Sequence, residues 1–274
     1  MNQNHDRSLP VKHNLTLIYA SSLIIALLMA GVSVYSLLYQ DQIYPTEQLL
    51  RTFMPNDVVN LFIGVPILLG SMWAARRGKL IGLLFWTGAL FFGIYNTIAY
   101  VFALPFNWAF LLNLVIAVLS VYTLIGLAVN IDGKIVQQQI SGRVPEKLCG
   151  GVLVALGLLF FLRVIGLITN ALRTGVLINP SELAVNISDI FIAPAFIIVG
   201  IQLWRAKALG YTAGLGLLFQ GSMLFIGLLI FLLIQPLLTS APFAAVDFIV
   251  IAVMGLVCFL PFAYFLRGVI RSNN

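Results

Sequence analysis

Long runs of apolar residues, separated by short polar segments, make up most of the chain. Eight of these runs are about twenty residues or longer, and none alternates in polarity as the strands of a membrane barrel do. A segment that crosses a bilayer must pair its own backbone N–H and C=O groups, so runs of this length predict helices. The sequence therefore predicts an all-α fold, a polytopic transmembrane helical bundle of about eight spans. We place these spans near 15–39, 57–75, 80–103, 107–129, 149–171, 184–204, 209–235 and 243–266.

The composition indicates which solvent surrounds the protein. Hydrophobic residues make up 61% of the chain and charged residues 9%, and the mean hydropathy is +1.05. A soluble domain carries about 25% charged residues, so a surface this apolar requires lipid around it. The first run is too long for the core of a signal peptide, and we expect it to be a permanent helix. We expect an integral membrane protein, located in the plasma membrane of a prokaryotic cell.

Basic residues gather in the segments between alternate spans, and this predicts the orientation. Lysine and arginine are enriched in cytoplasmic loops, so we place the N-terminus and, after an even number of spans, the C-terminus in the cytoplasm. Only Arg51 and Arg173 then lie outside, while Arg163 lies within a span. The asymmetry accounts for the net charge of +6, so we predict no nucleic-acid partner. The cytoplasmic set is Arg7, Lys12, Arg76, Arg77, Lys79, Lys134, Arg143, Lys147, Arg205, Lys207, Arg267 and Arg271.

Three short matches suggest that the chain contains an internal repeat. "LLFWTGALFFG" at 83–93 and "LLFQGSMLFIG" at 217–227 are identical at six of eleven positions. A Pro-Thr/Ser-Glu triplet before the second and sixth spans, and a tryptophan followed by basic residues after them, lie in similar register. We predict two parallel four-helix repeats, 1–130 and 149–274, joined by a cytoplasmic linker at 131–148. Helices rich in leucine and phenylalanine also produce chance matches, which leaves two unrelated halves as the alternative.

Proline and glutamate mark the starts of helices on the outer side. Proline suits the first helical position, and an acidic residue soon after it favours the positive end of the helix dipole. We predict that Pro55 interrupts the second span, with a short helix at 45–53 and a new start near Asn56 or Asp57. The sixth span is expected to run on from Pro180 without a break.

Arg163 is the most unusual polar residue, because it stands inside the apolar segment "GLLFFLRVIGLITNAL" at 157–172. An arginine near the centre of a span costs roughly 2.5–3.5 kcal/mol on insertion scales, so a partner or a hydrated surrounding is expected. Gly166 and Asn170 share its helical stripe, which predicts an inward-facing and partly hydrated face. A structural ion pair and a substrate contact both remain open for this arginine.

Three aspartates lie on the same side of the membrane as the outward end of Arg163. Asp189 and Asp247 are its predicted partners, because they belong to the same half of the chain, whereas Asp57 belongs to the other half. Asp57 and Asp189 can alternatively cap the helices that start near them. Amides on neighbouring spans can join the set, or can simply hold helices together. The predicted ligand-binding residues are Arg163, Asn170, Asp189, Asp247, Asp57, Asn60 and Asn113.

Several kinds of chemistry have no sequence motif in this chain. The two histidines, His5 and His13, both precede the first span, so no bis-histidine haem site can form between the helices. Motifs for a HExxH zinc site, a P-loop and a GxSxG nucleophile are missing, and the two cysteines do not have metal-binding spacing. We therefore predict no cofactor, no metal and no catalytic residue, which argues against an enzyme without excluding one.

Three function classes follow from these features. The first is binding or transport of a small polar, anionic or lipid-like ligand in an outward-facing intramembrane cavity near Arg163, with membrane lipids around the protein. The second is a noncatalytic partner or assembly subunit, whose polar groups only fix the packing. The third is an intramembrane enzyme that modifies lipid and uses the aspartates as acid or base. Glycine-rich faces suit packing within a monomer and between protomers alike, so the oligomeric state is left open.

Overall fold

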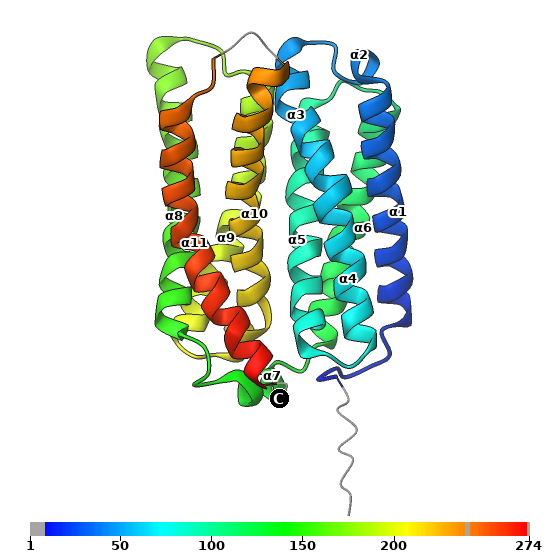
Figure 1. Ribbon diagram of the computed structural model, residues 1–274, viewed down its shortest axis with the longest axis vertical. Coiled ribbons are helices and arrows are strands. Elements are labelled where there is room, and N and C mark those ends of the chain that lie inside the picture. The colour runs from blue at the N-terminus through cyan, green and yellow to red at the C-terminus, as the bar shows by residue number, and fades with distance from the viewer. Residues whose placement is uncertain (1–8, 239–241, 273–274) are drawn as a thin grey trace, which may run out of the picture.

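The predicted bundle of eight spans is confirmed. The computed structural model describes residues 9–238 and 242–272. Within these ranges, eight helices are long and apolar enough to cross a membrane, and they stand roughly parallel to one another (Figure 1). In chain order they are α1 (Thr16–Leu38), the composite span α3–η1–α4 (Glu47–Arg76), α5 (Leu80–Ala103), α6 (Trp108–Asn130), α8 (Glu146–Thr174), α9 (Pro180–Trp204), α10 (Ala208–Leu238) and α11 (Ala245–Ser272).

The basic residues gather at one end of this bundle, which we call the basic end. It is the lower end in Figure 1 and carries α7 (Gly133–Ile140) and the C-terminal end of α11. The segments that join alternate spans bring the predicted cytoplasmic set together there, except for Arg7, which like His5 lies outside the described residues. Arg51 and Arg173 lie toward the opposite end, in α3 and α8. The positive-inside rule predicts that the basic end is cytoplasmic.

The first four spans and the last four form two groups that meet where α5 packs against α9 and α10 (Figure 1). Helix α5 is the most buried span, and it packs against α4 and α6 in its own group and against α9 and α10 in the other. Gly88 and Gly216 bring α5 and α10 close together, because a Cβ atom on Gly88 would lie 2.7 Å from the Cα atom of Gly216. The prediction that the two groups are copies of one repeat rests on the sequence matches.

The second span differs from its prediction, since Pro55 does not interrupt it. Helix α3 (Glu47–Val59) runs through Pro55, and Thr46 caps its start by accepting a hydrogen bond from the backbone N–H of Leu49. The irregularity comes later, as a π-helical turn η1 (Asn60–Gly64) before α4 (Val65–Arg76). There the N–H of Val65 bonds to the carbonyl oxygen of Asn60, five residues earlier. Helix α9 begins at its proline and continues unbroken, as predicted.

The linker between the two groups is a folded part of the bundle. Asp132 caps α7 by accepting hydrogen bonds from the backbone N–H groups of Lys134 and Ile135. Val136 and Ile140 are fully buried, and α7 packs against α10 and α11. The contacts of α7 therefore fix the basic ends of these two spans.

Candidate functional site

Close packing of α8 against α9 positions the arginine of the apolar segment. A Cβ atom on Gly150 would lie 2.6 Å from the carbonyl oxygen of Gly200, and one on Gly157 would lie 2.9 Å from that of Ala193. Small residues at such spacings let two membrane helices approach along their backbones. Further along the same pair of helices, this approach brings Arg163 of α8 beside Asp189 of α9.

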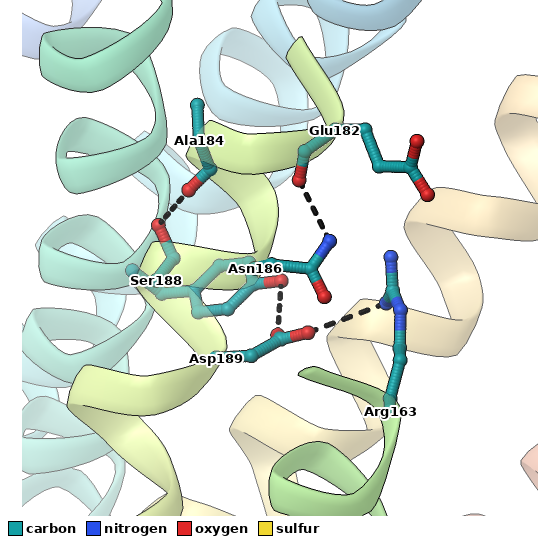
Figure 2. Close-up of polar contacts among 7 residues, drawn as sticks. Arg163, Glu182, Ala184, Asn186, Ser188 and Asp189 are labelled. Atoms are coloured by element: carbon teal, nitrogen blue, oxygen red, sulfur yellow. Dashed lines mark hydrogen bonds and ion pairs between the residues drawn. The ribbon is translucent and has the colours of Figure 1, made fainter. Parts of the chain in front are cut away.

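Asp189 joins three helices through its two carboxylate oxygens. Its Oδ2 atom accepts a hydrogen bond of 3.3 Å from Nη1 of Arg163, and its Oδ1 atom accepts one of 2.9 Å from the hydroxyl of Tyr95 on α5. The aspartate is fully buried, and Figure 2 shows it on α9 with its carboxylate turned toward Arg163 of α8. Of the two predicted partners of Arg163, the structure pairs the arginine with Asp189. The same carboxylate also links the two groups of spans.

Arg163 is only partly satisfied by this pair. A guanidinium group has five N–H donors, and 49% of the Arg163 side chain stays exposed while that of Asp189 is fully buried. Ten residues of helix, roughly 15 Å, separate it from Arg173, so it begins near the middle of a hydrocarbon layer about 30 Å thick. At that depth bulk water alone cannot solvate the guanidinium group. Its N–H groups that are not bonded to Asp189 face the surroundings of α8.

The stripe formed by Gly166 and Asn170 faces outward, which corrects the predicted inward-facing surface. Both residues are exposed, and a Cβ atom on Gly166 would meet no other atom within 4 Å. Within 162–174 only Val164 is buried, whereas the other buried residues of α8 lie in its basic half, where Gly150 and Gly157 pack against α9. Asn170 therefore shares a surface with Arg163 but not an enclosed cavity.

Asn186 adds a second incompletely bonded polar group near the ion pair. It is 2% exposed and lies three residues before Asp189, on the same face of α9. Its Nδ2 atom donates a hydrogen bond of 2.7 Å to the carbonyl oxygen of Glu182, while its Oδ1 atom has no partner among the described residues. In Figure 2 the side chains of Asn186, Asp189 and Arg163 point toward one another. The cluster thus offers one free acceptor and several free donors.

Asp57 occupies a different and more closed setting in the first group of spans. It is 1% exposed and lies inside α3, so the alternative that it caps a helix start is wrong. Its Oδ1 atom accepts a hydrogen bond of 2.8 Å from Tyr100, and its Oδ2 atom accepts one from Tyr44. Burial, and then the nearby Asp57, raise the pKa of Tyr44, so this phenol keeps its proton and remains a donor. These contacts fix α3 against α5.

The remaining predicted residues are not brought to Arg163 by any described contact. Asn60 accepts a hydrogen bond of 3.1 Å from Asn96, and Asn113 donates one of 2.9 Å to the carbonyl oxygen of Ala109 in its own helix. Asp247 is exposed in the first turn of α11. The candidate site therefore consists of Arg163 and Asp189 together with Tyr95 and Asn186.

Sequence reasoning missed Tyr95 and Asn186. Tyr95 lies among apolar residues of α5, and its only signal is that a buried phenolic hydroxyl needs a partner. Asn186 has a clearer signal, because its spacing from Asp189 places both on one face of a helix.

No model of a known protein family matches this chain, and neither a curated protein nor a solved structure matches it.

Proposed function

We propose that this multi-pass membrane protein binds an amphipathic ligand whose polar head contacts Arg163. The observation that supports this proposal is a half-exposed guanidinium group at membrane depth, held by one hydrogen bond to a fully buried carboxylate. A purely structural ion pair would be expected to bury both partners, since each exposed charge in hydrocarbon is costly. A ligand head that covers the remaining donors would remove this cost.

The chemistry of the head follows from the groups that lack partners. Arg163 offers N–H donors, which match a phosphate or carboxylate oxygen, and Asn186 offers a buried amide oxygen that needs a donor. A phosphomonoester, a carboxylic acid or a hydroxyl-bearing head supplies both an acceptor and a donor. Asp189 is already bonded to one nitrogen of the guanidinium, so the ligand head would contact the remaining N–H donors of Arg163.

The exposed face of α8 provides a surface for the apolar part of such a ligand. Leu159, Leu162 and Ile165 flank Arg163 and are 42%, 65% and 58% exposed. An acyl or isoprenoid chain can lie along these side chains from within the bilayer. The ligand that we propose is therefore lipid-like and reaches the site laterally. Transport is an extension of the same hypothesis, in which the two groups of spans move relative to each other at α5 and α10.

The test uses two probes that share an acyl chain and differ in the phosphate, 1-oleoyl lysophosphatidate and 1-monooleoylglycerol. We expect lysophosphatidate to raise the melting temperature of the detergent-solubilised protein more than monooleoylglycerol does. Arg163→Leu should lose this difference, because the phosphate then has no cation to contact. Arg173→Leu is the matched control on the same helix and should keep it. Equal stabilisation of wild type and Arg163→Leu by lysophosphatidate would contradict the proposal.

A second candidate, the noncatalytic partner subunit, is favoured by the outward faces of two spans. Only 22% of the most apolar window of α8, and the same share of α11, is buried, which is the lowest among the eight spans. A helix of another membrane protein can cover these faces and supply an acceptor to Arg163. Cysteine crosslinking from position 162 in native membranes separates the two functions. A crosslinked polypeptide supports the partner subunit, and a crosslinked lipid supports the proposed ligand.

A further inference from the structure

We infer that a hollow at the basic end binds the phosphate-bearing head group of an anionic membrane lipid. The hollow has a volume of about 600 Å³ and lies between the segment that precedes α8 and the last turns of α11. Arg143, Arg267 and Arg271 line it, together with Leu148 and Tyr264. It is separate from the Arg163 site, and the inference does not depend on the proposed function.

The sequence builds this hollow from one face of α11. Arg267 and Gly268 follow Tyr264 by three and four residues, and Arg271 follows them by four and three, so the four residues share a helix face. A Cβ atom on Gly268 would lie 2.5 Å from the carbonyl oxygen of Arg143, so only glycine lets the linker pack this closely against α11. The Nη1 atom of Arg143 also donates a hydrogen bond of 3.2 Å to the carbonyl oxygen of Arg271. The three guanidinium groups are thus brought together by two segments that are far apart in the sequence.

The charged side chains that line the hollow in the described part of the chain are all arginines. No carboxylate is among its lining residues in the described part of the chain. Glu146 lies beside the hollow, because its Oε1 atom accepts hydrogen bonds from the N–H of Gly142, a lining residue, at 3.0 Å and from the hydroxyl of Tyr211 at 2.9 Å. One carboxylate against three arginines still leaves an excess of positive charge at the hollow. Three clustered cations repel one another, and an anion between them relieves that repulsion. Arginine in particular binds phosphate oxygens in a bidentate fashion.

The apolar residues of the hollow favour a lipid over a soluble phosphate. Leu148 and Tyr264 are 50% and 53% exposed. Leu148 lies in the first turn of α8, after Arg143, and Tyr264 lies before Arg267 and Arg271 on α11, so both are nearer the middle of the bundle than these arginines. Tyrosine at this depth is typical of the membrane interface, where its ring meets acyl chains and its hydroxyl meets head groups. Basic pockets between spans on the cytoplasmic side are known sites for anionic lipid heads. The predicted orientation places this hollow in that leaflet.

The experiment titrates phosphatidylglycerol or phosphatidylcholine into the full-length protein in detergent and counts bound lipids by native mass spectrometry. We expect phosphatidylglycerol to bind more tightly than phosphatidylcholine. The double variant Arg267→Gln/Arg271→Gln should weaken phosphatidylglycerol binding roughly 25-fold, about fivefold for each arginine. The matched control, Arg205→Gln/Lys207→Gln, removes two basic-end charges outside the hollow and should bind like wild type. Arg163→Leu should also leave this site unchanged.

Three results would overturn the inference. The first is unchanged binding in the Arg267→Gln/Arg271→Gln variant with an unaltered melting curve. The second is an equal loss in the control variant, which would show a general effect of surface charge. The third is displacement of the lipid by inorganic phosphate, but not by chloride of the same ionic strength, which would assign the hollow to a soluble anion. If the double variant does not fold, Arg143→Gln tests the same hollow from the linker side.

Discussion

Tyr95 of α5 donates a 2.9 Å hydrogen bond to Asp189 of α9, and this contact ties the first group of spans to the second at the candidate site. Asp189 is fully buried, so its charge depends on this phenol and on Arg163. The tyrosine thus positions the carboxylate that in turn holds the arginine. Two substitutions separate these roles.

Tyr95→Phe keeps the ring and removes only the hydroxyl. We expect the free energy of unfolding to fall by about 1–2 kcal/mol, because a buried carboxylate loses one of its donors. Titration with a denaturing detergent, followed by circular dichroism, measures the change. Tyr122→Phe removes the same atom from a tyrosine that is 71% exposed on α6, and it should cost little. Equal stability of the two variants would show that the hydrogen bond to Asp189 contributes nothing.

Arg163→Leu should destabilise the protein by roughly 1–3 kcal/mol, because it leaves the carboxylate of Asp189 buried without its cation. Asp189→Asn alone should also destabilise the protein, since the arginine then loses its counter-ion. The double variant should be more stable than the sum of the two losses predicts, because it leaves no unpaired charge. The same detergent titration, applied to all four proteins, gives the coupling energy. A coupling energy of zero would show that Arg163 and Asp189 do not stabilise each other.

The spans could be predicted from sequence because length and hydropathy alone decide whether a segment crosses a bilayer. The error at Pro55 has a tertiary cause. A proline inside a helix removes one hydrogen bond, which favours a break, but contacts on both sides of it hold the helix together. Phe53 is 1% exposed, and Asp57 is bonded to two tyrosines. Neither contact can be read from the local sequence.

The sequence predicted the candidate site only where a charged residue inside a span required a counter-ion. Arg163 required a counter-ion, and the choice of Asp189 or Asp247 followed from their place in the chain. The direction of the stripe with Gly166 and Asn170 was wrong because it depends on which neighbouring helix covers α8. Gly150 and Gly157 pack against α9 in the basic half of α8, while only Val164 is buried within 162–174.

Gly88→Ala tests the contact between the two groups of spans. The added Cβ atom would lie 2.7 Å from the Cα atom and 2.8 Å from the carbonyl oxygen of Gly216, so α5 and α10 must move apart. We expect a loss of about 1–3 kcal/mol, as for other overpacked sites. Gly227→Ala is the matched control on α10, because its Cβ atom meets nothing within 4 Å. It should be neutral or slightly stabilising, since alanine favours helix. If Gly88→Ala is as stable as wild type, α5 and α10 can move apart at this point without a loss of stability.

Gln220→Leu tests a buried amide that the fold leaves without partners. Gln220 is fully buried in α10, and neither its Nε2 nor its Oε1 atom has a hydrogen-bond partner among the described residues. A leucine of similar size removes two unpaired polar atoms, so we expect a higher melting temperature and a gain of about 1–2 kcal/mol. Asn96→Leu is the comparison, because that amide bonds to Asn56 and Asn60 at 3.1 Å each, and its loss should destabilise the protein. A destabilised Gln220→Leu would instead indicate that a bound water or ligand pairs with this amide in the membrane.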